Sequence, residues 1–159
     1  MPSRLPSPGS FALVVALASL AGCTQNDDPE GASRLYAKIN EGEGFRTWRR
    51  APGFATRQPS FTAHSDAVEV FVNAEVAAAL DGPTPILTWP EGALIVKEGF
   101  SGDARSLVAV MEKRAGRWYW AEYDGDGNAL YSGEPKVCVG CHDKRQSYSD
   151  WVYSFELPR

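Results

Sequence analysis

The pentapeptide CVGCH, at residues 138–142, limits what this chain can fold into more than any other stretch of its sequence. Two cysteines three positions apart, with a histidine directly after them, can hold a haem, contribute to a metal site or form a disulfide. The compartment in which the chain folds, and the other ligands that it offers, decide between these three uses.

The N-terminus predicts export from the cytoplasm. A positive charge at Arg4 precedes an apolar run over residues 11–20, which is too short to span a bilayer and has the layout of a signal peptide. The run leads into LAGC, which resembles the lipobox of bacterial lipoproteins, where the signal is removed before the cysteine and the thiol is lipidated. We therefore expect a signal peptide at residues 1–22 and a lipid anchor at Cys23, which holds the protein to a membrane in the periplasm.

The residues after Cys23 are polar, TQNDDPEGAS, and predict a flexible lipidated tether at residues 23–35. The remaining chain, residues 36–159, is long enough for one domain with a single modest core. The net charge of −4, with no basic stripe in the sequence, argues against a nucleic-acid partner.

The middle of the domain has the pattern of β structure. In AVEVFVN, residues 67–73, every second residue is Val, and Asn73 can cap a short helix through AEVAAAL. Three more strand-like runs follow, separated by turns that contain Gly or Asp: ALIVKEG, SLVAVMEK and RWYWAEY. Because no βαβ rhythm is present, we expect a mainly β (α+β) fold, with an antiparallel sheet and a few short helices.

Covalent haem attachment uses all three residues of the motif. Cys138 and Cys141 would form thioethers with the haem, and His142 would ligate the iron from the proximal side. A structural zinc site needs four ligands, and the second histidine, His64, stands at no recognisable spacing. A Cys138–Cys141 disulfide would give a haem-free lipoprotein, although the thioredoxin-like setting of such a disulfide is absent. The sequence predicts one covalent haem c, with the disulfide as an alternative.

A second axial ligand would indicate an electron-transfer cytochrome, and two residues could supply it. Met111 lies in a strand-like run, where a core methionine is more typical. His64 lies in the polar stretch TAHSD, where a hydrogen-bonded loop residue is more typical. We therefore expect an open distal site that binds small molecules, and a six-coordinate electron carrier remains the alternative.

Six stretches stand in a fixed order along the chain: FRTW (45–48), AHSDAVEVFVN (63–73), PEGALIVKEG (90–99), AVMEK (109–113), RWYWAEYDGDG (117–127) and CVGCH. In this order, over residues 36–155, they resemble the cytochrome P-460 family and its relatives, the cytochromes c′-beta. The resemblance implies a mostly antiparallel β fold that carries one covalently bound haem with a proximal histidine.

The resemblance also singles out Lys97. In the P-460 proteins, a lysine in the corresponding VKE stretch is bonded to a meso carbon of the haem. By strand alternation, Lys97 shares a face with Ala93 and Ile95, and burial on this apolar row would lower its pKa and leave a nucleophilic amine. The alternative is a lysine that extends to solvent at a strand end.

The family also implies two activities. The P-460 enzymes oxidise hydroxylamine, whereas the c′-beta proteins bind nitric oxide in an aromatic-capped pocket. The enzymes' proton-accepting carboxylate aligns near Val108 and an arginine aligns near Val68, which leaves Glu98 and Glu112 as candidate proton acceptors. The candidates to cap the pocket are Phe61, Phe71 and Phe100.

We accordingly expect a cytochrome that binds or oxidises small nitrogen species, such as nitric oxide or hydroxylamine. Whether it is an oxidoreductase is left undecided. We expect it to exchange electrons with a periplasmic partner and to meet the membrane through its lipid anchor alone. The sequence leaves open whether the protein is a monomer or a homodimer.

Overall fold

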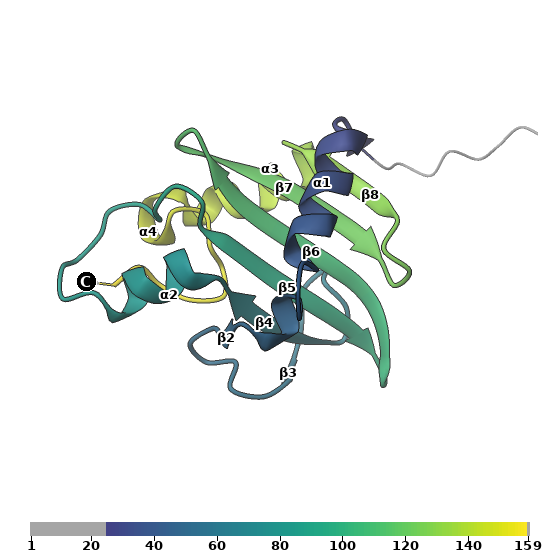
Figure 1. The fold of residues 1–159 in the computed structure, drawn as a ribbon, viewed down its shortest axis with the longest axis horizontal. Helices are drawn as coiled ribbons and strands as arrows, with labels where there is room; N and C mark the ends of the chain where they lie inside the picture. Colours follow the sequence, from purple (N-terminus) through teal and green to yellow (C-terminus); the bar gives the residue numbers. More distant parts are fainter. Residues whose placement is uncertain (1–24, 159) are drawn as a thin grey trace, which may run out of the picture.

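The computed structural model describes residues 25–158, which form one mixed sheet with helices on both faces (Figure 1). Within these residues, eight strands occur in the order β1-β8-β7-β6-β5-β4-β2, with β3 paired to β4. Their bounds are β1 (Gln25–Asn26), β2 (Arg49–Arg50), β3 (Gln58–Pro59), β4 (Ala67–Val72), β5 (Leu94–Ser101), β6 (Ala104–Arg114), β7 (Arg117–Asp124) and β8 (Ala129–Gly133). All neighbouring pairs are antiparallel except β1 with β8, so the mainly β, antiparallel prediction is confirmed apart from that parallel pair.

The helices are short and lie on opposite sides of the sheet. Their bounds are α1 (Pro29–Ile39), η1 (Phe45–Thr47), α2 (Ala74–Asp81), α3 (Lys136–His142), η2 (Asp143–Arg145) and α4 (Gln146–Ser149). Helix α1 crosses the front of the sheet in Figure 1. The predicted cap of α2 is confirmed, because the Asn73 side chain accepts a hydrogen bond from the Val76 amide.

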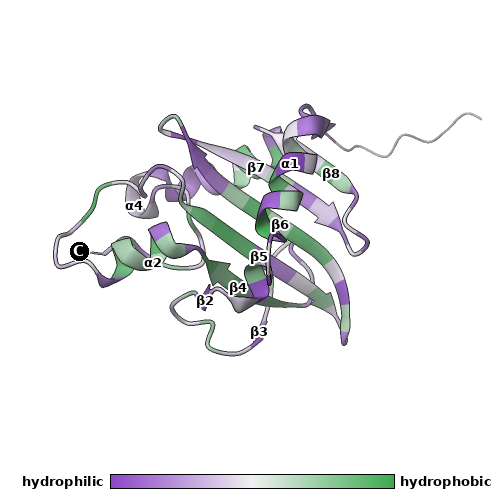
Figure 2. Ribbon diagram, in the orientation of Figure 1, coloured by the Kyte–Doolittle hydropathy of each residue, from purple (hydrophilic) through white to green (hydrophobic). Residues whose placement is uncertain are grey.

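Strand alternation divides the core into two clusters, one on each face of the sheet. One face, which we call the helix face, packs Val96, Val108 and Tyr123 against α1. The other, which we call the motif face, packs Ile95, Met111 and Trp120 against the segment from α3 to the C-terminus. Figure 2 shows that the central strands β5 and β6 are largely hydrophobic, as strands covered on both faces require.

Residues 25–35, which the sequence assigned to a flexible tether, belong to the fold, so the predicted start of the domain at residue 36 is wrong. Strand β1 already pairs with β8, and the Asp28 side chain caps α1 by accepting a hydrogen bond from the Gly31 amide at 2.9 Å. Pro29 at the first helical position is a further start signal. Three apolar residues of α1 are fully buried: Ala32, Leu35 and Ile39. Their spacing of three and four marks a helix, although polar residues surround them.

The predicted signal peptide and the lipid anchor at Cys23 lie outside the described residues. Within residues 25–158, no helix is both long and apolar enough to cross a membrane.

Candidate haem-attachment site

The CVGCH motif occupies helix α3 on the motif face of the sheet. The three-position spacing places Cys138 and Cys141 on the same side of the helix, one turn apart. Both thiols are free, and Cys138 is partly buried while Cys141 is exposed. His142, at the end of the helix, is buried with 8% of its surface exposed.

The ring of His142 is held in the state that a metal ligand requires. Its Nδ1 lies 2.6 Å from the carbonyl oxygen of Trp151, so Nδ1 donates this hydrogen bond and Nε2 keeps its lone pair. The pKa of His142 is lowered to about 4, mainly by burial and in part by the charges of Lys97 and His64, while the hydrogen bond to Trp151 acts in the opposite direction. The imidazole is therefore neutral at physiological pH, with Nε2 available to bind iron.

The Trp151 carbonyl is positioned by a strained turn after α4. Asp150 and Trp151 have φ angles of 47° and 73°, a left-handed conformation that residues other than glycine rarely adopt. The Asp150 carboxylate accepts a hydrogen bond from the Trp89 amide at 2.9 Å and forms a buried ion pair with Lys113 at 2.7 Å. The Asp150 carbonyl accepts a 2.8 Å hydrogen bond from Trp118 Nε1. This buried network holds the turn in place beside His142.

Aromatic side chains surround the His142 ring. The centroids of Trp120 and Tyr153 lie 4.6 Å and 5.2 Å from it, both in edge-to-face geometry. The Tyr153 hydroxyl also donates to the Cys141 carbonyl at 3.1 Å. A cavity of about 500 Å³ opens beside α3, and Trp118, Trp120, Val139 and Trp151 are among its lining residues. These aromatic residues, rather than the predicted phenylalanines, shape the apolar surroundings of the motif.

Lys97 lies on the motif face, as strand alternation predicted. It pairs with Ala109 on β6, which in turn pairs with Glu122 on β7, so the three residues form one row across the sheet. Burial lowers the pKa of Lys97, while negative charge on Cys141 and Glu122 acts in the opposite direction. The structure thus brings Lys97 beside the motif.

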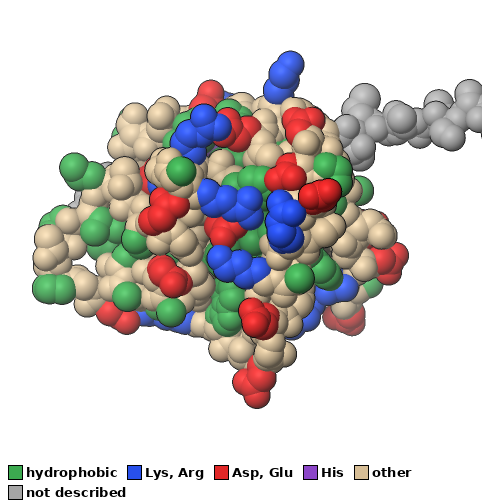
Figure 3. All heavy atoms as spheres, turned by 45° about the horizontal axis from the view of Figure 1, so that its top comes forward, with side chains coloured by type: hydrophobic (Ala, Val, Ile, Leu, Met, Phe, Trp, Pro, Cys, Tyr) green, Lys and Arg blue, Asp and Glu red, His purple; other side chains and the backbone are tan. Residues whose placement is uncertain are grey.

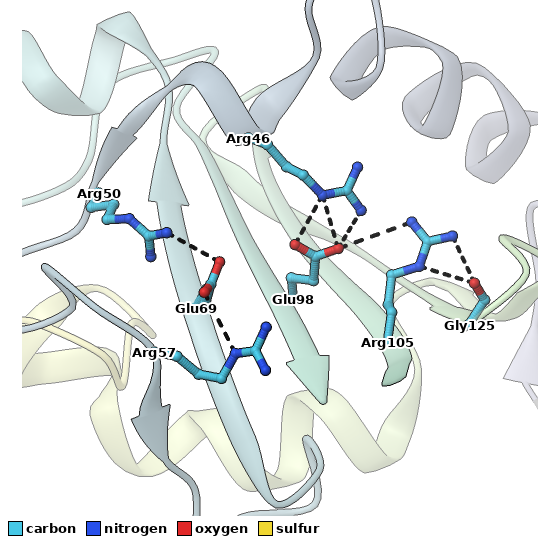
Figure 4. Close-up of polar contacts among 7 residues, drawn as sticks. All are labelled: Arg46, Arg50, Arg57, Glu69, Glu98, Arg105 and Gly125. Atoms are coloured by element: carbon cyan, nitrogen blue, oxygen red, sulfur yellow. Dashed lines mark hydrogen bonds and ion pairs between the residues drawn. The ribbon is translucent and has the colours of Figure 1, made fainter. Parts of the chain in front are cut away.

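Glu98 and Glu112 lie on the helix face, opposite the motif, and this corrects their prediction as proton acceptors. Successive strand residues point to opposite faces, so Glu98 must point away from the site if Lys97 points toward it. Figure 4 shows the Glu98 carboxylate bound by Arg46 and approached by Arg105. Glu112 is bound by Lys38 at 2.7 Å and by Arg114. Both carboxylates are therefore held in ion pairs on the helix face, away from the motif.

The phenylalanines predicted to cap the pocket do not gather at the motif. Phe71 and Val108 are buried in the helix-face core, so Val108 does not stand at the site, and the β6 residue beside Lys97 is Ala109. Phe100 packs beneath Arg57, whose guanidinium carbon lies 3.4 Å from the ring centroid. Phe61 is 98% exposed. Val68, near which the arginine of the enzymes aligns, is buried in β4.

Glu122 and His64 lie closer together and closer to the motif than the sequence suggested. Nδ1 of His64 lies 3.2 Å from Oε2 of Glu122, without the geometry of a hydrogen bond, so this buried nitrogen has no hydrogen-bond partner. The rings of His64 and His142 lie with their centroids 6.4 Å apart and their planes at 72°. The signal for Glu122 was present in RWYWAEY, because alternation places it on the same face as Trp118 and Trp120.

The fold and the motif together define a class of protein. A CxxCH helix against an antiparallel sheet, with a neutral, oriented histidine and a second histidine with an unsatisfied nitrogen, has the donor set of a c-type haem protein. A sequence model of the cytochrome P460 family matches residues 42–154, and the chain belongs to this family. Family membership implies that the protein binds haem. A comparison with curated proteins found no match.

Proposed function

We propose that this chain is a monohaem c-type cytochrome that binds or oxidises small nitrogen species, such as nitric oxide or hydroxylamine. The observation that carries the proposal is the buried His142, which is neutral and oriented by the Trp151 carbonyl at the end of the CVGCH helix. When bound, the haem supplies a redox centre and a site for a small ligand. The side chains around it determine which ligand is held and where protons go.

The two cysteines are suited to covalent attachment. Burial, with a further contribution from Glu122, raises the pKa of the Cys138 thiol to about 12. Because the thiolate is the form that exchanges into disulfides, this shift slows disulfide exchange at Cys138. The free thiols of the structure are in accord with a haem attachment site.

Glu122 and Lys97 are the charged residues that can act on a bound substrate. Glu122 is an acidic side chain on the motif face and can accept a proton as electrons leave the substrate. Lys97 is the residue at which the family divides: cross-linked to haem, it would favour hydroxylamine oxidation, and unlinked, it would favour gas binding. Its buried amine beside Cys141 is compatible with either.

We further propose that the protein is a periplasmic lipoprotein anchored through Cys23 and exchanges electrons with a periplasmic partner. On the face in Figure 3, basic and acidic side chains are intermixed, which gives no support to a nucleic-acid partner. Labelled palmitate should enter the wild type and be absent from Cys23→Ser. Label that persists in this variant would exclude the anchor.

The function is tested on protein matured in a host with c-type haem biogenesis. Denaturing gels stained for haem should be positive for the wild type and for Cys23→Ser, the matched cysteine control, and negative for Cys138→Ala and Cys141→Ala. The purified protein is then titrated with nitric oxide and with hydroxylamine in the presence of an electron acceptor. A haem protein whose spectrum responds to neither would contradict the proposed substrate class.

A further inference from the structure

The distance between the His64 and His142 rings would suit two ligands of one metal ion. If two imidazoles bind opposite sides of one metal ion through nitrogens about 2 Å from it, their centroids lie roughly 6 Å apart. The His64 and His142 centroids are separated by 6.4 Å, with the rings at 72°. The two rings therefore stand at the spacing of histidines that share one iron.

The environment of His64 also fits ligation. A buried nitrogen without a hydrogen-bond partner is costly, and such a group in a folded protein marks an absent ion, water or functional contact. His64 Nδ1 is such a group, and Glu122 Oε2 lies 3.2 Å from it. Metal-bound histidines commonly donate their second nitrogen to a carboxylate, which fixes the tautomer. Glu122 would accept a hydrogen bond from His64 Nδ1, as the Trp151 carbonyl accepts one from His142 Nδ1.

The loop that carries His64 is fixed against the sheet. The Asp66 amide donates to the Phe100 carbonyl at 3.2 Å, and Ser65 adopts a left-handed φ of 78°. At Gly99 on β5, an added Cβ would lie 2.9 Å from Ser65 Cβ and 3.0 Å from the His64 carbonyl oxygen. The loop can approach the strand this closely only because residue 99 is glycine. The position of His64 is therefore built into the fold.

We propose that His64 is the second axial ligand of the haem iron, opposite His142, and that an incoming small ligand binds by displacing it. The proposal rests on the proposed function in one respect, that CVGCH carries a haem. It replaces the expected open distal site with a closed one, in which the His64–iron bond breaks, its lone pair stays on the imidazole, and the incoming ligand donates its own pair to iron. Met111, the other ligand candidate, is packed in the motif-face core beside Ile95.

The spin state of the haem tests the proposal directly. Absorption and electron paramagnetic resonance spectra of the mature ferric protein should be low-spin, and His64→Ala should be high-spin, with added imidazole restoring the low-spin spectrum. Met111→Leu is the matched control and should keep the wild-type spectrum. A high-spin wild type, or a low-spin spectrum that survives His64→Ala, would overturn the proposal.

A kinetic measurement serves if His64→Ala does not mature. Carbon monoxide binding to the reduced wild type should reach a limiting rate as the gas concentration rises, because His64 must dissociate first. Gly99→Ala, which pushes the His64 loop away from β5, should remove this limit. A rate that stays proportional to gas concentration in the wild type would refute displacement. A protein without haem would overturn the proposed function as well, whereas a haem protein with a high-spin spectrum overturns this proposal alone.

Discussion

The buried polar groups beside the CVGCH helix differ from those on the helix face, although the motif face also holds the paired Lys113 and Asp150 farther along the sheet. On the helix face, Glu98 and Glu112 are each held by two basic side chains. On the motif face, His64 Nδ1 is buried without a hydrogen-bond partner, and among residues 25–158 Lys97 forms no ion pair. Buried charges that are fully paired need no further partner, because their ion pairs offset the free-energy cost of removing them from water. Unsatisfied groups gathered beside a CxxCH helix indicate that a cofactor completes them.

The largest effect is expected at the buried support of the motif face. Asp150→Asn leaves the Lys113 ammonium buried without its counter-ion and frees the turn that holds the Trp151 carbonyl. Breaking such a pair should lower the free energy of unfolding by about 3–5 kcal/mol in denaturant titrations. In the control, Asp81→Asn removes an exposed pair with Arg49 and should cost less than about 1 kcal/mol. Equal losses in the two variants would show that the turn is not held by this pair.

Glu98→Gln tests whether a buried carboxylate on the helix face contributes to stability alone. The substitution weakens the contacts of Arg46 and Arg105 with a buried carboxylate, so we expect a loss of about 2 kcal/mol in stability. The haem spectrum should not change, because Glu98 points away from the motif. A spectral change as large as that of a motif-face substitution would mean that the two faces are not separate.

Glu122→Gln is the converse experiment on the motif face. Because Glu122 lies beside His64 without an established hydrogen bond, stability should change by less than about 1 kcal/mol. The haem spectrum and the rate of carbon monoxide binding should change, since the amide is a weaker acceptor for His64 Nδ1. A variant with lowered stability and an unaltered spectrum would assign Glu122 to the structural group with Glu98.

The smallest effect is expected at Phe61, which sequence reasoning offered as a pocket cap. Its side chain is almost fully exposed, so Phe61→Ser should change the free energy of unfolding by no more than about 0.5 kcal/mol. Its nitric oxide affinity should equal that of the wild type. Weakened binding would restore Phe61 as a cap.

The sequence predicted the central strands because their alternation and turn residues are local signals. It missed β1 and the first turn of α1, where a long-range pairing with β8 and a cap at Asp28 outweigh a polar composition. The error at Glu98 was avoidable, since alternation already separated it from Lys97. The Trp151 carbonyl could not be predicted, because it is a backbone group placed by a strained turn and a distant ion pair.

The placement of Glu122 and His64 shows a second limit of prediction from the sequence. Alternation predicts which face Glu122 occupies, but its approach to His64 depends on the register of β7 against β6 and on the loop packed at Gly99. These are long-range contacts that composition and spacing do not record. For the same reason, the family resemblance placed the enzymes' proton-accepting carboxylate near Val108, although the β6 residue that pairs with Lys97 is Ala109.

The intact mass of the mature protein under denaturing conditions tests the central claim, that CVGCH on the motif face holds one haem covalently. The account predicts the mass of the chain plus one haem for the wild type, and the mass of the chain alone once Cys138 and Cys141 are both replaced by alanine. Peptide mapping of the same sample shows whether the Lys97 peptide is joined to the haem peptide as well. A wild type that carries no covalent haem would contradict the account.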